Sequence, residues 1–160
     1  MIGTISVCFS QIDEDQFTMD MDSLIRLTDD EFKPIIASET HKKDGETFYE
    51  VTFLPSGSKR GTVSIDEENY RSYFCYFELS TNTLAATELE KISRLVAEAG
   101  EKHGLAMSSG TDVKYKNFKA VRIEFDSDNI DDLGKHPSFT IGILKNAPTV
   151  EVILTEPLWK

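Results

Sequence analysis

The sequence predicts an α+β fold in which a mostly antiparallel, twisted sheet of about six to eight strands carries one long helix, at about residues 87–103, on a face. Short runs that are apolar, or that alternate apolar with polar residues, recur between turn residues, as strands do. One longer stretch places its apolar residues at helical spacing. Neither an internal repeat nor a Pro/Gly/Ser-rich linker divides the 160 residues, so we expect a single globular domain, 1–160.

Seven runs are expected to form strands. They are 3–9 (GTISVCF), 48–54 (FYEVTFL), 61–65 (GTVSI), 70–79 (YRSYFCYFEL), 120–125 (AVRIEF), 139–144 (FTIGIL) and 149–154 (TVEVIL). Turn residues suggest hairpins at Asp44-Gly45 and at 55–61 (PSGSKRG), and KNAP joins the last two strands. The centre of the fourth run, YFCYF, is apolar on both sides, which predicts a central strand that is covered on each face.

The long helix is expected to begin near Thr87, because Thr87 and Glu90 have the spacing of a capping box. Its apolar stripe would consist of Leu89, Ile92, Val96 and Ala99. Gly104 is well placed to end it. His103, in the last turn, is expected to interact with the helix dipole rather than with a substrate.

The segment before Pro34 fits two structures. Phe17, Met19 and Met21 alternate with polar residues, as in a strand, whereas Phe17, Met21, Leu24, Ile25 and Thr28 fit a helix equally well. We favour a short strand through Met21, followed by a possible short helix near 23–33 with Asp22 as its N-cap. Pro34 is expected to end any helix before Lys33.

Negative charge is concentrated in residues 11–31, QIDEDQFTMDMDSLIRLTDDE, which contain eight of the chain's 28 acidic residues and one arginine. The eight are Asp13, Glu14, Asp15, Asp20, Asp22, Asp29, Asp30 and Glu31. Met19, Met21, Leu24 and Ile25 lie among them. Acidic groups beside adaptable apolar side chains predict a protein-binding surface, and a solvated acidic rim is the simpler alternative.

The sequence does not match the residue spacing of known metal-binding and phosphate-binding motifs. An EF-hand loop needs oxygen ligands at positions 1, 3 and 5, Gly at 6 and Glu at 12, and registers that start at Asp13, Asp20 or Asp126 break this pattern. The segment 55–61 lacks the Gly-Lys-Ser/Thr of a phosphate-binding loop. We therefore predict no metal and no cofactor.

Catalytic patterns fail as well. Cys8 and Cys75 have apolar neighbours and no Cys-x-x-Cys spacing, which is typical of reduced core thiols in a cytoplasmic protein. No motif ties His41, His103 or His136 to a nucleophile. No secretion signal precedes the first run, and no stretch approaches the roughly 20 apolar residues of a membrane-spanning helix. The sequence predicts no catalytic residue and no membrane partner.

The charge balance argues against nucleic acid. The net charge is -11, and residues 1–70 contain 15 acidic and 6 basic residues, against 13 and 11 in residues 71–160. Phosphates would repel such a surface. The segment 114–125, KYKNFKAVRIEF, interleaves basic and aromatic residues as RNA-binding sheets do, but it lacks the glycines of the RNA-recognition signature. An amphipathic strand with a basic outer side explains it better.

These observations favour a non-enzymatic, cytoplasmic, acidic binding protein that occludes a basic surface of a nuclease- or toxin-type protein, as immunity proteins do. The eight carboxylates would speed and orient the encounter, and a few apolar side chains would hold the complex. A second hypothesis is a small enzyme or ligand-binding domain with a cleft between sheet and helix, lined by Glu78, Glu124 and His136. A third is a structural subunit that assembles through an exposed strand.

Overall fold

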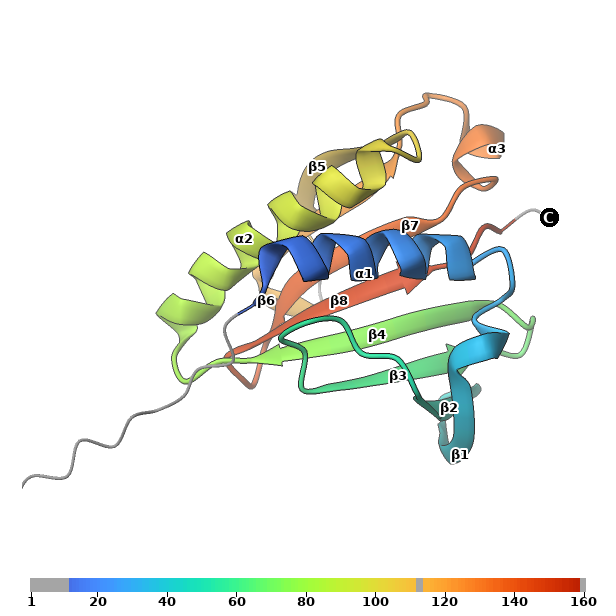
Figure 1. Ribbon diagram of the computed structural model, residues 1–160, viewed down its shortest axis with the longest axis horizontal. Coiled ribbons are helices and arrows are strands. Elements are labelled where there is room, and N and C mark those ends of the chain that lie inside the picture. The colour runs from blue at the N-terminus through green and yellow to red at the C-terminus, as the bar shows by residue number, and fades with distance from the viewer. Residues whose placement is uncertain (1–11, 112–113, 159–160) are drawn as a thin grey trace, which may run out of the picture.

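The computed structural model describes residues 12–111 and 114–158, and in them eight antiparallel strands form one sheet with two helices on one face (Figure 1). The strands are β1 (Ile36–Lys43), β2 (Glu46–Val51), β3 (Arg60–Ile65), β4 (Arg71–Glu78), β5 (Leu105–Thr111), β6 (Tyr115–Phe125), β7 (Ser138–Leu144) and β8 (Thr149–Thr155). The helices are α1 (Glu14–Leu27), α2 (Asn82–Glu101) and the short α3 (Ile130–Leu133), with a 3-10 turn, η1 (Lys33–Ile35). The predicted α+β fold is confirmed.

The chain builds the sheet in two halves with the same order of elements. In each half a helix precedes a four-stranded meander: α1 precedes β1 to β4, and α2 precedes β5 to β8. The strand order is β1-β2-β3-β4-β8-β7-β6-β5, so the last strand of each meander lies at the centre and the first lies at an edge. β4 and β8 join the halves, with Cys75 opposite Val152.

The core lies between the two helices and the face of the sheet beneath them. Phe17 of α1 contacts Phe77 of β4 edge to face, with 5.8 Å between ring centroids. Tyr73 of β4 is also buried, and its hydroxyl donates a hydrogen bond of 2.8 Å to the Phe53 carbonyl. Cys75 is fully buried there, and burial raises the pKa of its thiol. Cys75 is therefore a core residue, as predicted.

The favoured prediction for residues 17–33 is wrong, because one helix runs from Glu14 to Leu27. Its N-cap is Asp13 rather than Asp22, and the Asp13 carboxylate accepts a hydrogen bond of 3.0 Å from the Gln16 N–H. The helical alternative wins because Phe17, Met21, Leu24 and Ile25 all become buried on one side. The apolar–polar alternation that favoured a strand covers only five residues, 17–21, and a strand there would not bury all four of these side chains.

The long helix is confirmed, although it begins at Asn82 and ends at Glu101 instead of spanning about 87–103. Thr81 is the N-cap, and its hydroxyl accepts a hydrogen bond of 3.2 Å from the Leu84 N–H. The capping-box spacing at Thr87 therefore falls inside the helix, where the Thr87 hydroxyl donates to the Thr83 carbonyl. In the described part of the chain, no helix is long and apolar enough to cross a membrane.

The predicted turns are present, whereas both edge strands were missed. Asp44 and Gly45, with φ of 52° and 83°, join β1 to β2, and the KNAP segment joins β7 to β8. β1 and β5 are largely exposed and lack the apolar alternation that identifies a half-buried strand. The predicted strand 3–9 lies outside the described residues.

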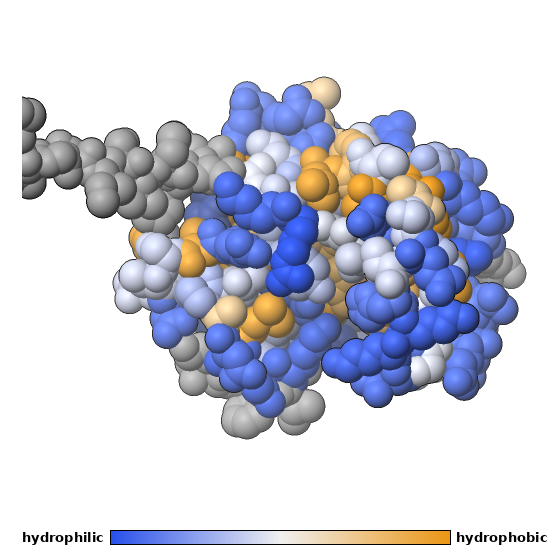
Figure 2. All heavy atoms as spheres, turned by 90° about the horizontal axis from the view of Figure 1, so that it is seen from below, coloured by the Kyte–Doolittle hydropathy of each residue, from blue (hydrophilic) through white to orange (hydrophobic). Residues whose placement is uncertain are grey.

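The helices cover one face of the sheet, so the prediction that the YFCYF strand is covered on both faces is wrong. Phe74 and Tyr76, which point to the other face, are half-buried. Seen from below, the molecule has a mostly hydrophilic surface with small hydrophobic patches (Figure 2). The Tyr115 hydroxyl donates a hydrogen bond of 3.1 Å to Glu151, and Lys114 Nζ lies 2.8 Å from the same carboxylate. Burial, with Glu151 nearby, raises the pKa of Tyr76.

Candidate protein-binding surface

The fold distributes the eight carboxylates of residues 13–31 among different environments. Because Phe17, Met21, Leu24 and Ile25 turn toward the sheet, the residues between them turn toward solvent, toward α2 or toward the loop after β2. The sequence-based grouping of Met21, Leu24 and Ile25 with a binding surface is therefore wrong, since all three are in the core. Met19 remains at the surface, with 64% of its area exposed.

Asp20 is an internal structural residue. It is 8% exposed, and its two carboxylate oxygens accept hydrogen bonds of 2.8 Å each from the Gln16 side chain and from the Ser56 N–H. Ser56 belongs to the loop between β2 and β3, so Asp20 fastens that loop to α1. A buried carboxylate with these bonds is not available to a partner.

Glu14 and Asp22 connect α1 to α2. Glu14 lies 3.0 Å from Arg94 and 3.5 Å from Lys91, and the hydrogen bond from Arg94 lowers the pKa of Glu14 despite its partial desolvation. Asp22 lies 2.8 Å from His103 Nε2. These pairs show that α1 and α2 run in the same direction, because position 14 faces 91–94 and position 22 faces 103.

Asp22 also lies 3.1 Å from Arg26, one turn further along α1. The hydrogen bond from His103, followed by the charge of Arg26, lowers the pKa of Asp22. The sequence placed His103 in the last helical turn, but α2 ends at Glu101 and the ring reaches across to α1. His103 thus makes a tertiary contact with α1 that the sequence did not predict.

Glu31, two residues before η1, belongs to an ion-pair cluster. It lies 2.7 Å from Lys33 and 3.2 Å from Arg71, which also approaches the buried Glu156 at 3.8 Å. The remaining acids, Asp13, Asp15, Asp29 and Asp30, are exposed. Residues 13–31 thus supply both internal contacts and a smaller acidic surface.

The exposed side of α1 forms one wall of a groove, which we call the α1–α2 groove. It has a volume of about 500 Å³ and is lined by Asp15, Thr18, Met19, Asp22, Ser23, Glu98 and Lys102. Three acidic residues and one lysine therefore line the groove together with an exposed methionine. Asp15 forms no ion pair with any residue that the structure describes. The groove therefore combines an exposed apolar side chain, Met19, with a carboxylate, Asp15, that is not already paired within the described part of the fold. We find no other such combination in the segment 13–31.

A second acidic cluster was not predicted from the sequence. Two hairpin turns bring together Asp44, Glu46, Asp66, Glu67 and Glu68, beside Gly45. The carboxylate of Asp66 is used locally, because it accepts hydrogen bonds of 2.9 Å from the N–H groups of Glu68 and Tyr70. The turn residues DG and DEEN were the signal, but only the pairing of β2 with β3 places the two turns together. Large apolar side chains do not line this cluster.

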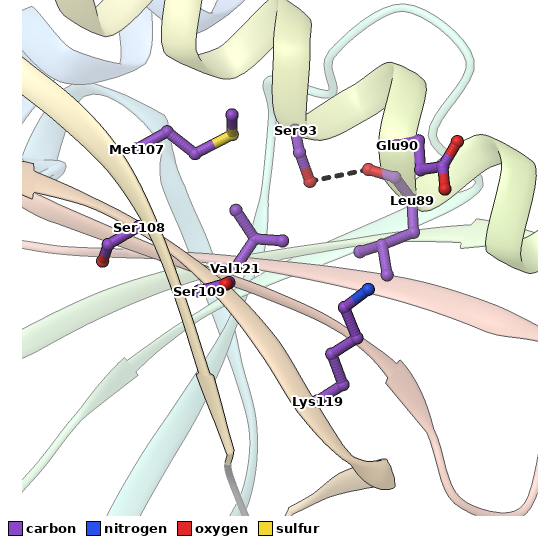
Figure 3. Close-up of a pocket in the computed structure, with 8 residues that line it drawn as sticks. All are labelled: Leu89, Glu90, Ser93, Met107, Ser108, Ser109, Lys119 and Val121. Atoms are coloured by element: carbon purple, nitrogen blue, oxygen red, sulfur yellow. Dashed lines mark hydrogen bonds between the residues drawn. The ribbon is translucent and has the colours of Figure 1, made fainter.

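The cleft of the second hypothesis exists, with different residues. A hollow of about 370 Å³ lies between α2 and the β5–β6 hairpin, lined by Leu89, Glu90, Ser93, Met107, Ser108, Ser109, Lys119 and Val121 (Figure 3). Glu78, Glu124 and His136 do not line it: Glu78 approaches Arg60 at 3.4 Å, and His136 stacks on Phe125. The Ser93 hydroxyl is already bonded to the Leu89 carbonyl at 2.6 Å.

The described residues contain no group of three or more His, Cys, Asp or Glu side chains that could hold a metal ion. Comparison with protein-family models, with curated proteins and with solved structures finds no match for this chain. The functional argument therefore depends on the surface chemistry described above.

Proposed function

We propose that this protein is an acidic, non-enzymatic binding protein of the cytoplasm that occludes a basic surface of another protein, as immunity proteins and other inhibitors of nucleases or toxins do. The α1–α2 groove is the proposed contact. The observation that carries the proposal is Met19, which is 64% exposed on a helix whose other large apolar residues are buried or, at Leu27, partly buried. Asp15, Asp22 and Glu98 line the same groove.

The net charge, Met19 and Asp15 would each contribute to binding in a different way. Long-range attraction by the net charge of -11 would raise the rate of encounter with a basic protein. Met19 would supply the apolar contact that holds the complex, since methionine adapts to irregular partner surfaces. Asp15 would supply a specific charge pair, whereas Asp20, Asp22, Glu14 and Glu31 are already committed within the fold.

The test compares three variants in the capture of native-cell proteins on the tagged protein at low salt, followed by elution with increasing salt. Asp15→Lys and Glu67→Lys change the net charge equally, one in the groove and one in the second acidic cluster, and Met19→Ala removes the apolar anchor. We expect a stoichiometric basic protein that Asp15→Lys releases at lower salt and Met19→Ala fails to retain. Glu67→Lys should leave its retention unchanged.

Two results would contradict the proposal. If Glu67→Lys weakened retention as much as Asp15→Lys, the interaction would depend on net charge and not on the groove. If the wild-type protein retained no basic protein, the occlusion of a basic partner would lose its support.

A further inference from the structure

The strand β5 is an edge strand without the features that protect edges from pairing. It ends the sheet next to β6, and positions 106–110 are exposed. Its sequence, LAMSSGT, contains no charged residue and no proline. An edge strand presents unpaired N–H and C=O groups, which form a template for another strand.

The opposite edge, β1, is protected. Its sequence, IASETHKK, contains Glu39, His41, Lys42 and Lys43, and two register shifts interrupt its pairing with β2. Charged side chains and bulges are the usual means by which proteins prevent edge-to-edge association. The sheet therefore has one edge, β1, that is protected from pairing with another strand, and one edge, β5, that is not. We call β5 the open edge.

A groove follows the open edge, and we call it the α2–β5 groove. It consists of two adjoining hollows, of about 370 and 540 Å³, which share Met107. Met107 is 57% exposed, and Figure 3 shows its side chain between β5 and α2, beside Val121. Leu89 and Ala97 of α2 contribute apolar surface to the wall of the groove. A strand added to β5 would therefore place alternate side chains beside an apolar surface.

The charges at the ends of the groove indicate a second copy of this chain as the occupant. Lys119 and Glu90 line the hollow at one end, and Lys119 is paired in register with Thr111. At the other end Arg94, Glu98 and Glu101 lie near Leu105. Antiparallel pairing of two β5 strands brings the Thr111 end of one copy against the Leu105 end of the other. Because Arg94 is paired with Glu98 at 2.9 Å, Glu101 is the excess negative charge at that end, and the pairing brings it to the end of the partner groove that Lys119 lines. This arrangement occurs twice by symmetry.

We propose that two copies associate through β5, antiparallel about a two-fold axis at Ser108, the midpoint of the strand. The sheet then continues from one copy into the other, and the Met107 side chains lie over the junction between the two α2 helices. The α1–α2 groove is distinct from this junction, although Glu98 lines both grooves. The inference does not depend on the proposed function.

Sedimentation equilibrium over a wide range of protein concentration tests the association. We expect a species of twice the chain mass, and Met107→Lys should raise its dissociation constant by at least about tenfold, because like charges would oppose each other across the junction. Ala37→Lys, on the exposed part of β1, is the matched control and should change nothing. Ser109→Lys gives a second test on the same exposed face of β5, and circular dichroism confirms that each variant folds.

Cross-linking tests the register. In a Cys8→Ser background the remaining native thiol, Cys75, is buried. Ser108→Cys should then form an intermolecular disulfide under mild oxidation, because residues opposite each other in an antiparallel pair lie within disulfide reach. Ala37→Cys should not.

Three outcomes would overturn the proposal. The first is a monomer at every concentration tested. The second is a dimer that Ala37→Lys disrupts and Met107→Lys does not. The third is a monomer whose β5 amides are protected from hydrogen exchange, because that protection would mean that another segment or a different protein covers the edge.

Discussion

The two halves of the molecule have the same order of elements and use charge in opposite ways. The first half, α1 with β1 to β4, holds most of the acidic excess, and its edge strand β1 is charged. The second half, α2 with β5 to β8, has a nearly balanced charge and an uncharged edge, β5. Their helices run in the same direction, so no simple two-fold axis relates the halves.

This difference shows that a run of acidic residues in a sequence is not the same thing as an acidic surface. Glu14 and Asp22 of the first half are paired with Arg94 and His103 of the second, and Asp20 holds a loop. Part of the negative charge therefore joins the halves together. The exposed remainder, with Met19, is what a partner could meet.

The largest expected effect concerns how α1 is attached to the sheet. Phe17→Ala should lower the free energy of unfolding by about 3–5 kcal/mol, because Phe17 is fully buried against Phe77 and truncation leaves a cavity. Met19→Ala, on the exposed side of the same helix, should stay within about 0.5 kcal/mol. Urea unfolding of both variants measures this. Equal losses would mean that the two sides of α1 are not distinguished as described.

The next effect belongs to the second half, on the face of the sheet away from the helices. A Cβ atom at Gly142 would overlap the Tyr115 ring, so Gly142→Ala should cost near the upper end of about 1–3 kcal/mol. Gly110→Ala is the control, because a Cβ there meets no atom within 4 Å. Thermal unfolding that showed no difference between the two would mean that Tyr115 does not lie over this strand.

A smaller effect is expected from Asp20, whose carboxylate forms hydrogen bonds within the first half. Asp20→Ala should cost about 1–2 kcal/mol, since it leaves the Ser56 N–H without its acceptor. Asp20→Asn keeps an oxygen acceptor and should cost less, and Asp15→Ala, at an exposed position, should cost least. If Asp15→Ala were the most destabilising of the three in urea unfolding, the assignment of internal and external acids would be wrong.

The smallest effect is a pH dependence at the contact between the halves. The His103 hydrogen bond lowers the pKa of Asp22 in the folded state. Its contribution to stability is therefore complete above the ordinary aspartate pKa of about 3.9 and is lost as the pH falls through the lower, folded-state value. The stability difference between the wild type and Asp22→Asn should therefore shrink as the pH falls below about 4.

Urea unfolding midpoints at a series of pH values measure that difference. His103→Ala removes the partner of Asp22 on the second half and leaves Arg26, so the same comparison made in a His103→Ala background should show a smaller difference at neutral pH. A difference that grew as the pH fell would contradict the direction of the Asp22 pKa shift.

Apart from α1, local patterns identified the main parts of the fold that are buried on one side. The sequence predicted the α+β class, the central strands β4 and β8, the turn at Asp44-Gly45 and the body of α2. Burial forces apolar residues into a period of two or of 3.6, and this period is visible without neighbours. The edge strands β1 and β5 are largely exposed and have no such constraint, so apolar residues do not recur in them with a regular period.

The candidate site was predicted only in part, for a related reason. The sequence located the acidic segment 13–31, but it could not separate Asp20, which meets Ser56, from Asp15, which meets solvent. That distinction depends on which residues of α1 face the sheet, and five alternating residues indicated the wrong period. The second acidic cluster, from 44–46 and 66–68, depends on strand pairing between positions far apart in the chain.

The sequence by itself therefore determined the class of fold, the sign of the charge, the central strands and the buried stripe of α2, because these follow from composition and from short-range periodicity. The tertiary structure decided which carboxylates pair with basic residues of the other half, which methionines stay exposed, and which edge of the sheet is open. Those properties depend on contacts between residues distant in sequence, and their energies exist only once the two halves have packed together.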